Sequence, residues 1–391
     1  MWKKWCAGIL CAAMLITGTG FSVKAAGKPD VSAKSAILIE AGTGRVLFEK
    51  NAHEQRPMAS TTKIMSALLT LESGELDRQF TVDPEAIMVE GSSMGLQKGD
   101  TVTKRILAYG MLLPSGNDAA NAAAVAVGGT AKEFVSMMNR RAQMLGLKNT
   151  SFETPSGLDG KNHYSTAADM ATLARAALKN PDFRDICGKS TAKVEFGNPP
   201  YTRWLSNHNR LLKEYQGTIG LKTGFTKKAG RCLVSAAERD GVTLICVTLN
   251  APNDWQDHKK LFDFGFGQVK PIQLDVQTDD LQLTVVGGQQ SKVGVLPGEY
   301  PTACITEADQ SKLVRRVLIK PFDYAPVEAG SVVGEVQYLL NGEVIASTAL
   351  LAQNDVAQKI TPIKVTFWDK VKRFFKNIYY SIVGFIQKIM D

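Results

Sequence analysis

Apolar residues along the chain recur with two periods, one of two residues and one of three to four. Apolar runs at 35–40 and 45–50 flank a Gly-rich turn, a pattern that predicts a β-hairpin. Helical spacing predicts helices over residues 61–71, 104–113, 118–127, 132–145 and 166–178. Strands are then predicted over residues 219–225, 231–238 and 242–249, followed by a last helix over 254–264.

The order of these elements favours an α+β fold. Strands lie at both ends of residues 27–268 and helices lie between them. This order indicates one antiparallel sheet, built from the first hairpin and the last three strands, with an inserted helical lobe. Residues 273–360 carry short β-like runs separated by Gly, Pro and Asp, which predict a small all-β domain.

The tail at 366–391 has the pattern of an amphipathic helix. Its apolar run at 378–386 is too short to span a bilayer, which needs about 20 residues. We expect it to bind a membrane surface in the plane of the interface; packing on a protein remains the alternative. The apolar positions are Val371, Phe375, Ile378, Ile382, Phe385 and Ile389, the cations are Lys370, Arg373, Lys376 and Lys388, and the interfacial aromatics are Phe367, Trp368, Tyr379 and Tyr380.

Composition bounds the class of protein. With 391 residues, 44% of them hydrophobic, the chain is long enough for two domains. The formal net charge is +8, but the cations are spread along the chain and concentrate only at its two ends. A nucleic-acid partner would require a basic stripe interleaved with aromatic residues or a known motif, and the sequence contains neither.

Residues 1–26 have the pattern of a secretory signal peptide. Lys3 and Lys4 precede an apolar stretch over 7–16, and small residues follow around Ala25. Cleavage after Ala25 or Ala26 would leave an exported protein at the outer face of the cytoplasmic membrane or in the cell wall. The alternative is an uncleaved anchor, which is less favoured because the apolar stretch is short for a span.

The cysteines predict neither disulfides nor a metal site. Two of the six lie in the signal segment, and the others form no C-x-x-C pair and have no histidine at metal-ligand spacing. A two-residue turn at 240–241 would pair residue 232 with residue 249, which puts Cys232 and Cys246 on opposite faces of the sheet. We therefore expect free, mostly buried cysteines.

Ser60 and Lys63 are three residues apart at the start of the first long helix. Unpaired N–H groups and the helix dipole there favour negative charge on a reacting oxygen. A serine hydroxyl becomes a nucleophile when a base takes its proton, and a lysine is such a base when its cationic form is disfavoured. Lys222 is a candidate second cation that lowers the pKa of Lys63. These residues predict Ser60 as nucleophile and Lys63 as base.

The segment Ser115-Gly116-Asn117 interrupts two predicted helices. Ser115 could relay a proton to a departing amine, and the Asn117 amide could hold a substrate backbone through one donor and one acceptor. Taken alone, the segment favours the simpler interpretation of a loop with a helix N-cap at Asn117 or Asp118.

The segment Lys222-Thr223-Gly224 lies in a predicted strand whose edge can pair with an extended peptide. Lys222 and Thr223 would bind a free carboxylate, and Gly224 permits close approach of the backbone. The N–H of Phe225 would form an oxyanion hole with that of Ser60.

These motifs form a combination already known from penicillin-binding proteins and class A β-lactamases. Over residues 30–265 the chain resembles the low-molecular-mass D-alanyl-D-alanine carboxypeptidases, which are serine-type penicillin-binding proteins, and its β domain and tail match the layout of that family. The segments that carry the resemblance are Pro57–Met65, Gly91–Met94, Leu113–Ala120, Pro155–Leu158, His163–Ala167 and Leu221–Thr226.

The resemblance implies a β-lactamase/transpeptidase-like catalytic domain. It implies removal of the terminal D-alanine from peptidoglycan pentapeptide stems through an acyl-enzyme at Ser60, and inhibition by β-lactams that acylate the same serine. No metal or organic cofactor is implied. Because such a mechanism needs no histidine, all four are interpreted as structural or surface residues, namely His53, His163, His208 and His258.

Two other functions compete with this one. A class A β-lactamase uses the same motifs plus a glutamate, and Glu153 falls at a plausible distance from Asn117. However, the segment after Glu153 lacks the E-x-x-L-N pattern of that class, and the β domain and tail have no place in it. A non-enzymatic wall-binding protein on a degenerate peptidase domain is disfavoured by the intact set of reactive residues.

Overall fold

The computed structural model describes residues 27–360 and 366–390, so the predicted signal peptide at 1–26 lies outside the described part. The chain divides into two compact units. Unit 1 comprises Met1–Pro271 and Cys304–Glu307, and unit 2 comprises Ile272–Ala303 and Ala308–Asp391.

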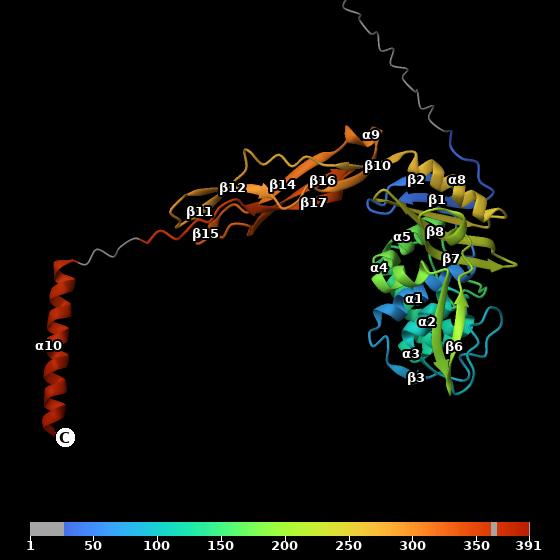
Figure 1. Ribbon diagram of the computed structural model, residues 1–391, viewed down its shortest axis with the longest axis horizontal. Coiled ribbons are helices and arrows are strands. Elements are labelled where there is room, and N and C mark those ends of the chain that lie inside the picture. The colour runs from blue at the N-terminus through green and yellow to red at the C-terminus, as the bar shows by residue number, and fades with distance from the viewer. Residues whose placement is uncertain (1–26, 361–365, 391) are drawn as a thin grey trace, which may run out of the picture. The chain divides into compact units, whose positions relative to one another are not determined.

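Unit 1 is built on a five-stranded antiparallel sheet with the order β2-β1-β9-β8-β7 (Figure 1). The predicted sheet, made of the first hairpin and the last three strands, is thereby confirmed. The register is also as predicted, because Leu233 pairs with Thr248 and Arg239 with Val242. The strands are β1 (Ser35–Glu40), β2 (Val46–Lys50), β7 (Thr218–Thr226), β8 (Gly230–Arg239) and β9 (Val242–Leu249).

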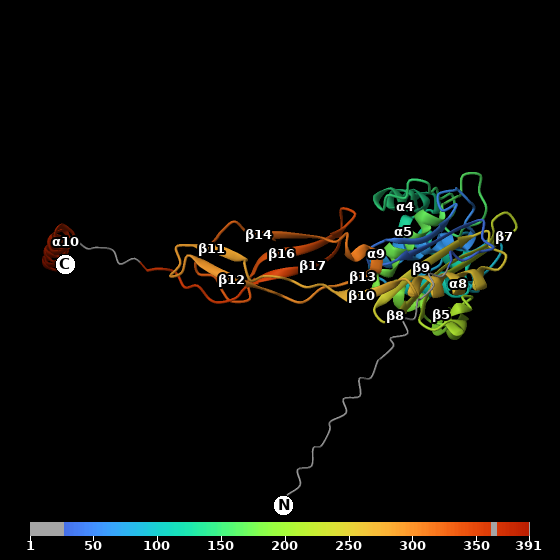
Figure 2. The same cartoon turned by 90° about the horizontal axis from the view of Figure 1, so that it is seen from above.

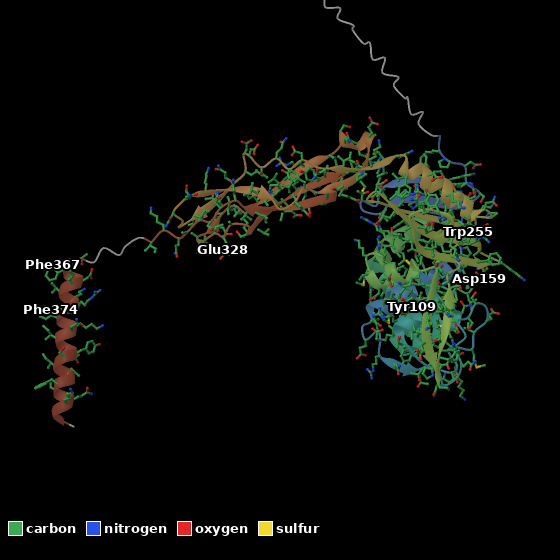
Figure 3. All side chains as sticks on the ribbon, viewed as in Figure 1. Tyr109, Asp159, Trp255, Glu328, Phe367 and Phe374 are labelled. Carbon is green, nitrogen blue, oxygen red and sulfur yellow. The ribbon has the colours of Figure 1, made fainter. Side chains whose placement is uncertain are left out.

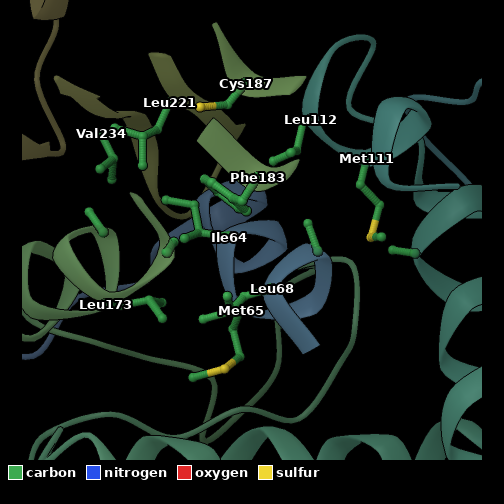
Figure 4. Packing of buried hydrophobic residues seen from close by; sticks show 14 of the residues in the cluster. Ile64, Met65, Leu68, Met111, Leu112, Leu173, Phe183, Cys187, Leu221 and Val234 are labelled. Atoms are coloured by element: carbon green, nitrogen blue, oxygen red, sulfur yellow. The ribbon is translucent and has the colours of Figure 1, made fainter. Parts of the chain in front are cut away.

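Each face of this sheet has its own core. The helical lobe packs on one face, where Ile64, Met65 and Leu68 of α1 lie among Leu173 and Phe183 (Figure 4). On the other face, α8 buries apolar side chains against β1, β8 and β9. The predicted helices correspond to α1 (Lys63–Glu72), α2 (Lys104–Leu112), α3 (Asn117–Gly128), α4 (Ala131–Met144), α5 (Ala167–Leu178) and α8 (Asp254–Phe266).

Residues 179–217 contain elements that the sequence pattern had not indicated. A β-hairpin is formed by β5 (Thr191–Gly197) and β6 (Pro200–Ser206). In β5 buried positions alternate with exposed ones, a period of two residues that is typical of a strand but was not identified in the sequence. The same region contains two short helices, α6 (Pro181–Cys187) and α7 (Leu211–Glu214). Two short strands precede it in the chain, β3 (Gln79–Thr81) and β4 (Thr101–Thr103).

Unit 2 contains a six-stranded sheet with the order β14-β16-β17-β12-β11-β15. Buried and exposed residues alternate in β11, as expected for a sheet with one face on a core, whereas the last three residues of β16 are all buried. The strands are β11 (Gln282–Val286), β12 (Lys292–Pro297), β14 (Val314–Ile319), β15 (Asp323–Tyr324), β16 (Val332–Leu340) and β17 (Glu343–Ala352). A short helix, α9, spans Glu307–Gln310, while β10 (Val269–Gln273) and β13 (Thr302–Thr306) pair with each other (Figure 2).

The tail forms one long helix, α10 (Phe367–Met390). Its aromatic side chains are exposed, and Figure 3 shows Phe367 and Phe374 projecting from it. Among the described residues, every helix is too short or too polar to cross a membrane. The side chain of Ile389, one of the predicted apolar positions, lies outside the described part.

Candidate active site

The predicted nucleophile lies in the short 3₁₀ helix Ala59–Thr62 that leads into α1. Ser60 lines a cavity of about 310 Å³. This cavity brings together four residues that the sequence had singled out separately, since Ser115, Thr223, Gly224 and Phe225 also line it. The remaining lining residues are Ser92, His208, Arg231, Asp254 and Trp255.

Lys63 is fully buried directly behind Ser60. Its Nζ lies 2.9 Å from Ser60 Oγ, 2.7 Å from Asn117 Oδ1 and 2.6 Å from the carbonyl oxygen of Ser156. Burial holds the pKa of Lys63 well below its usual value, and the cation of Lys222 lowers it further while Asp118 opposes the change. A neutral amine has two N–H groups, for Asn117 and Ser156, which leaves its lone pair for the hydroxyl proton of Ser60.

The junction between α2 and α3 places Ser115 and Asn117 in the same site as Ser60 and Lys63. Ser115 has a positive φ of 64°, a conformation in which few non-glycine residues are found. Asn117 is the first residue of α3, and residues outside this helix hold it in place. Its Nδ2 donates to the carbonyl oxygen of Glu90, and its backbone N–H donates to that of Ser92. The amide oxygen of Asn117 is thereby directed at Lys63.

Strand β7 forms the opposite wall. A Cβ on Gly224 would lie 3.1 Å from the backbone nitrogen of Ser60, so the strand passes directly beside the nucleophile. The Lys222 side chain is 1% exposed and its Nζ donates to the carbonyl oxygen of Thr223. Burial lowers the pKa of Lys222 to about 7. Phe225 is 66% exposed at the rim, which leaves this edge open to a peptide.

Several residues of the site had no predicted role. Ser92 and Ser156 belong to segments that carried the family resemblance, but nothing in their spacing indicated that one lines the cavity and the other accepts a hydrogen bond from Lys63. Arg231, which hydrogen-bonds Asp254, reaches the cavity from β8, a predicted strand to which no role in the site had been assigned. These contacts depend on tertiary packing.

The histidines differ from one another. His258 is buried between Ser235 and Thr248, and His163 is bonded to Thr62, so both have structural surroundings. His208, in contrast, lines the cavity, and burial, aided by Lys222, lowers its pKa.

Glu153, the residue that a β-lactamase would need, is engaged elsewhere. Its carboxylate accepts a hydrogen bond from the N–H of Asn162, and it is not among the residues that line the cavity. Among the described residues, no group of three or more His, Cys, Asp or Glu side chains is arranged to hold a metal ion. Within the same residues the four cysteines are free, three of them buried, as predicted.

Comparison with known proteins shows which families this chain resembles. Residues 22–253 match the family described as D-alanyl-D-alanine carboxypeptidase, and residues 266–358 match the C-terminal domain of penicillin-binding protein 5. The D-alanyl-D-alanine carboxypeptidase DacF of Bacillus subtilis is 33% identical over 87% of this chain and 90% of its own length.

Solved structures agree with these matches. Penicillin-binding protein 5 from Haemophilus influenzae is similar with a TM-score of 0.63 and 29% identity, over 84% of this chain and 99% of that chain. The Streptomyces K15 DD-transpeptidase is similar with a TM-score of 0.59 and 35% identity, over 61% of this chain and 99% of that chain.

Proposed function

The chain belongs to the D-alanyl-D-alanine carboxypeptidase family, and from this premise we propose that Ser60 is its nucleophile, activated by Lys63. The protein is a serine hydrolase that removes the terminal D-alanine from the pentapeptide stems of peptidoglycan. The observation that carries the proposal is the 2.9 Å contact between Lys63 Nζ and Ser60 Oγ, made by a lysine whose burial disfavours its cation.

Acylation follows from this contact. Ser60 Oγ attacks the carbonyl carbon of the penultimate D-alanine while its proton passes to the neutral amine of Lys63. The N–H groups of Ser60 and Phe225 would stabilise the oxyanion. When the C–N bond breaks, Ser115 relays a proton to the leaving nitrogen, and free D-alanine departs. Water then attacks the ester, which releases the shortened stem and restores the Ser60 hydroxyl.

The substrate is held by Thr223 and Gly224, which line the cavity, and by Lys222 and Asn117, which are buried and do not line it. Lys222 and Thr223 bind the terminal carboxylate, because Lys222 carries a positive charge below a pH of about 7. Asn117 holds the peptide backbone, and Gly224 lets the substrate lie against β7 as an added strand. β-Lactams, which bind to this family, would acylate Ser60 by the same route.

The compartment and the membrane contact are also part of the proposal. The relatives act on peptidoglycan, and the signal-like residues 1–26 suit export to the outer face of the cytoplasmic membrane. The exposed aromatic residues and the cations of α10 suit binding in the plane of an anionic lipid surface.

The test is D-alanine release from a D-Ala-D-Ala pentapeptide by Ser60→Ala and by the wild-type protein. We expect release by the wild type and a loss of at least about 10³-fold in the variant, since nucleophile and base act as a unit. Release by Ser60→Ala at the wild-type rate would refute Ser60 as nucleophile. Rapid hydrolysis of penicillin, abolished by Glu153→Ala, would instead favour a β-lactamase.

A further inference from the structure

The segment at residues 90–100, here called the strap, has no regular secondary structure and reaches the cavity at Ser92. It supplies the two carbonyl groups that fix Asn117, those of Glu90 and Ser92, and Ser92 itself lines the cavity. Most of the strap is exposed, so side chains from elsewhere must hold it in place.

One such side chain is Asp118, next to Asn117 on α3. Its carboxylate accepts hydrogen bonds from the N–H groups of Met94, Gly95 and Leu96. It also accepts one from the hydroxyl of Ser93, at 2.6 Å. Asp118 therefore ties the inner side of the strap to the helix that carries Asn117.

The outer side of the strap is held by Arg203 of β6. Its Nη1 donates to the carbonyl oxygen of Gly95 at 2.7 Å, and its Nη2 lies 3.5 Å from Asp100 Oδ2. Asp100 in turn accepts the N–H of Gln97. Gly95 thus donates a hydrogen bond from its N–H to Asp118 and accepts one at its carbonyl oxygen from Arg203. The two side chains therefore hold this residue through its two backbone polar groups.

Arg203 is itself held in one orientation. Its guanidinium lies 3.8 Å from the ring centre of Phe196 and 4.1 Å from that of Tyr201, and the side chain is 11% exposed. A planar guanidinium stacked in this way loses little conformational entropy when it donates to a carbonyl group. A flexible lysine side chain would lose more.

From these contacts we propose that Arg203 is a positioning residue for catalysis: it holds the strap on Asn117, and through Asn117 it fixes Lys63 beside Ser60. The inference rests on the proposed function of these two residues. Arg203 does not line the cavity, so it acts on the reaction only through the strap.

Loosening the strap would admit water beside Lys63. The charged groups that act on Lys63 are Lys222 from β7 and Asp118 from α3, and neither is removed when Arg203 is replaced. Better hydration stabilises the cation of Lys63 and raises its pKa. Because only the neutral amine accepts the Ser60 proton, the acid limb of the acylation rate would move to higher pH.

The test compares Arg203→Met with the wild type. Methionine keeps the packing between the two rings but cannot donate to Gly95. We measure the second-order rate constant of acylation by a fluorescent penicillin between pH 5 and 10, together with Tm. The expected result is roughly a tenfold loss at pH 7, an acid limb displaced upward by about half a unit or more, and recovery at high pH. Arg203→Lys should fall between the two.

Arg141→Met is the matched control, since Arg141 pairs with Glu72 at 2.7 Å and is 26% exposed, away from the strap. It should lower Tm without moving the acid limb. Ser93→Ala loosens the strap from its other side and should act like Arg203→Met even if the latter fails to fold.

Equal acid limbs in Arg203→Met, Ser93→Ala and the wild type would overturn the proposal, and so would a rate loss that follows Tm in all variants including the control. A wild-type protein acylated at a residue other than Ser60 would contradict the proposed function instead, so the two failures are distinguishable.

Discussion

The two units of the molecule differ in how many polar side chains they bury. Among the described residues, the buried polar side chains of unit 2 are Asp309 and Thr348. Unit 1 buries two lysines, Lys63 and Lys222, together with several carboxylates, two separate histidines and many hydroxyl groups. A buried polar group that lacks a partner costs roughly 1–3 kcal/mol, so unit 1 is stable only because nearly every such group is bonded.

This difference shows where function is located. A strand that alternates buried apolar and exposed residues, as β11 of unit 2 does, needs no buried charge to fold. Burial in unit 1 lowers the pKa values of both amines, that of Lys222 to about 7, and so favours the neutral form that can accept a proton. Variants that remove polar groups should therefore affect unit 1 far more than unit 2.

The largest effect is expected for Lys63→Met. Loss of the base should lower acylation by about 10³-fold or more. Tm should also fall, because Asn117 Oδ1 and the carbonyl oxygen of Ser156 lose their buried donor. Lys320→Met in unit 2, which removes a lysine paired with Asp323 at the surface, should change neither quantity. Acylation of Lys63→Met at a tenth of the wild-type rate or faster would contradict the role of Lys63.

The next effect is on stability. Asp118→Asn turns an acceptor of four strap hydrogen bonds into a group with one acceptor and an unwanted donor, so unfolding of unit 1 should become easier by about 3 kcal/mol. Thr348→Val removes one of the few buried hydroxyls of unit 2 and should cost less than about 1 kcal/mol. Equal losses in denaturant titrations of the two variants would show that the units do not differ in this way.

A third effect concerns the alkaline side of the pH profile. The pKa of Lys222 is about 7, so above this pH it loses the charge that attracts a substrate carboxylate. kcat/KM for a pentapeptide should then fall about tenfold per pH unit, or about a hundredfold between pH 7 and 9. Lys222→Arg keeps its charge and should lack this limb even if its maximum is lower. A limb at the same pH in both proteins would assign it to another group.

The smallest effect is the acid sensitivity of unit 1, which contains all four histidines. Burial lowers the pKa of His258 to about 3, whereas an unfolded histidine has a pKa of about 6.5. Between these values only the unfolded chain binds the proton, so stability falls as pH falls below 6.5. The loss from this residue is roughly 2 kcal/mol at pH 5.

Calorimetry at pH 5 and 7 would test this expectation. The transition of unit 1 should move with pH, and that of unit 2, which lacks histidine, should move less. His258→Gln should unfold more readily at pH 7 yet show a weaker pH dependence. The same pH dependence in His258→Gln and the wild type would rule out His258 as its source.

The sequence predicts which strands make up the sheet of unit 1, because the first hairpin and the last three strands are bounded by clear turn signals. The hairpin of β5 and β6 was not predicted, and its importance becomes clear only from tertiary packing, in which Phe196 and Tyr201 stack on Arg203. The motif residues were found because each carries chemistry in its own right. Arg203, Asp118 and Ser156 act through contacts between distant segments, which no local pattern encodes.

The bare backbone at Gly224 limits how resistance can arise. A Cβ at this position would lie 3.0 Å from the carbonyl oxygen of Met58 and 3.1 Å from the nitrogens of Ser60 and Thr61. These are backbone atoms, which cannot rotate aside as a flexible side chain would. A bacterium under antibiotic selection therefore cannot narrow the groove here without displacing the serine on which it depends. Resistance to drugs anchored on this stretch of β7 would have to arise at other lining positions, such as the exposed Phe225 at the rim.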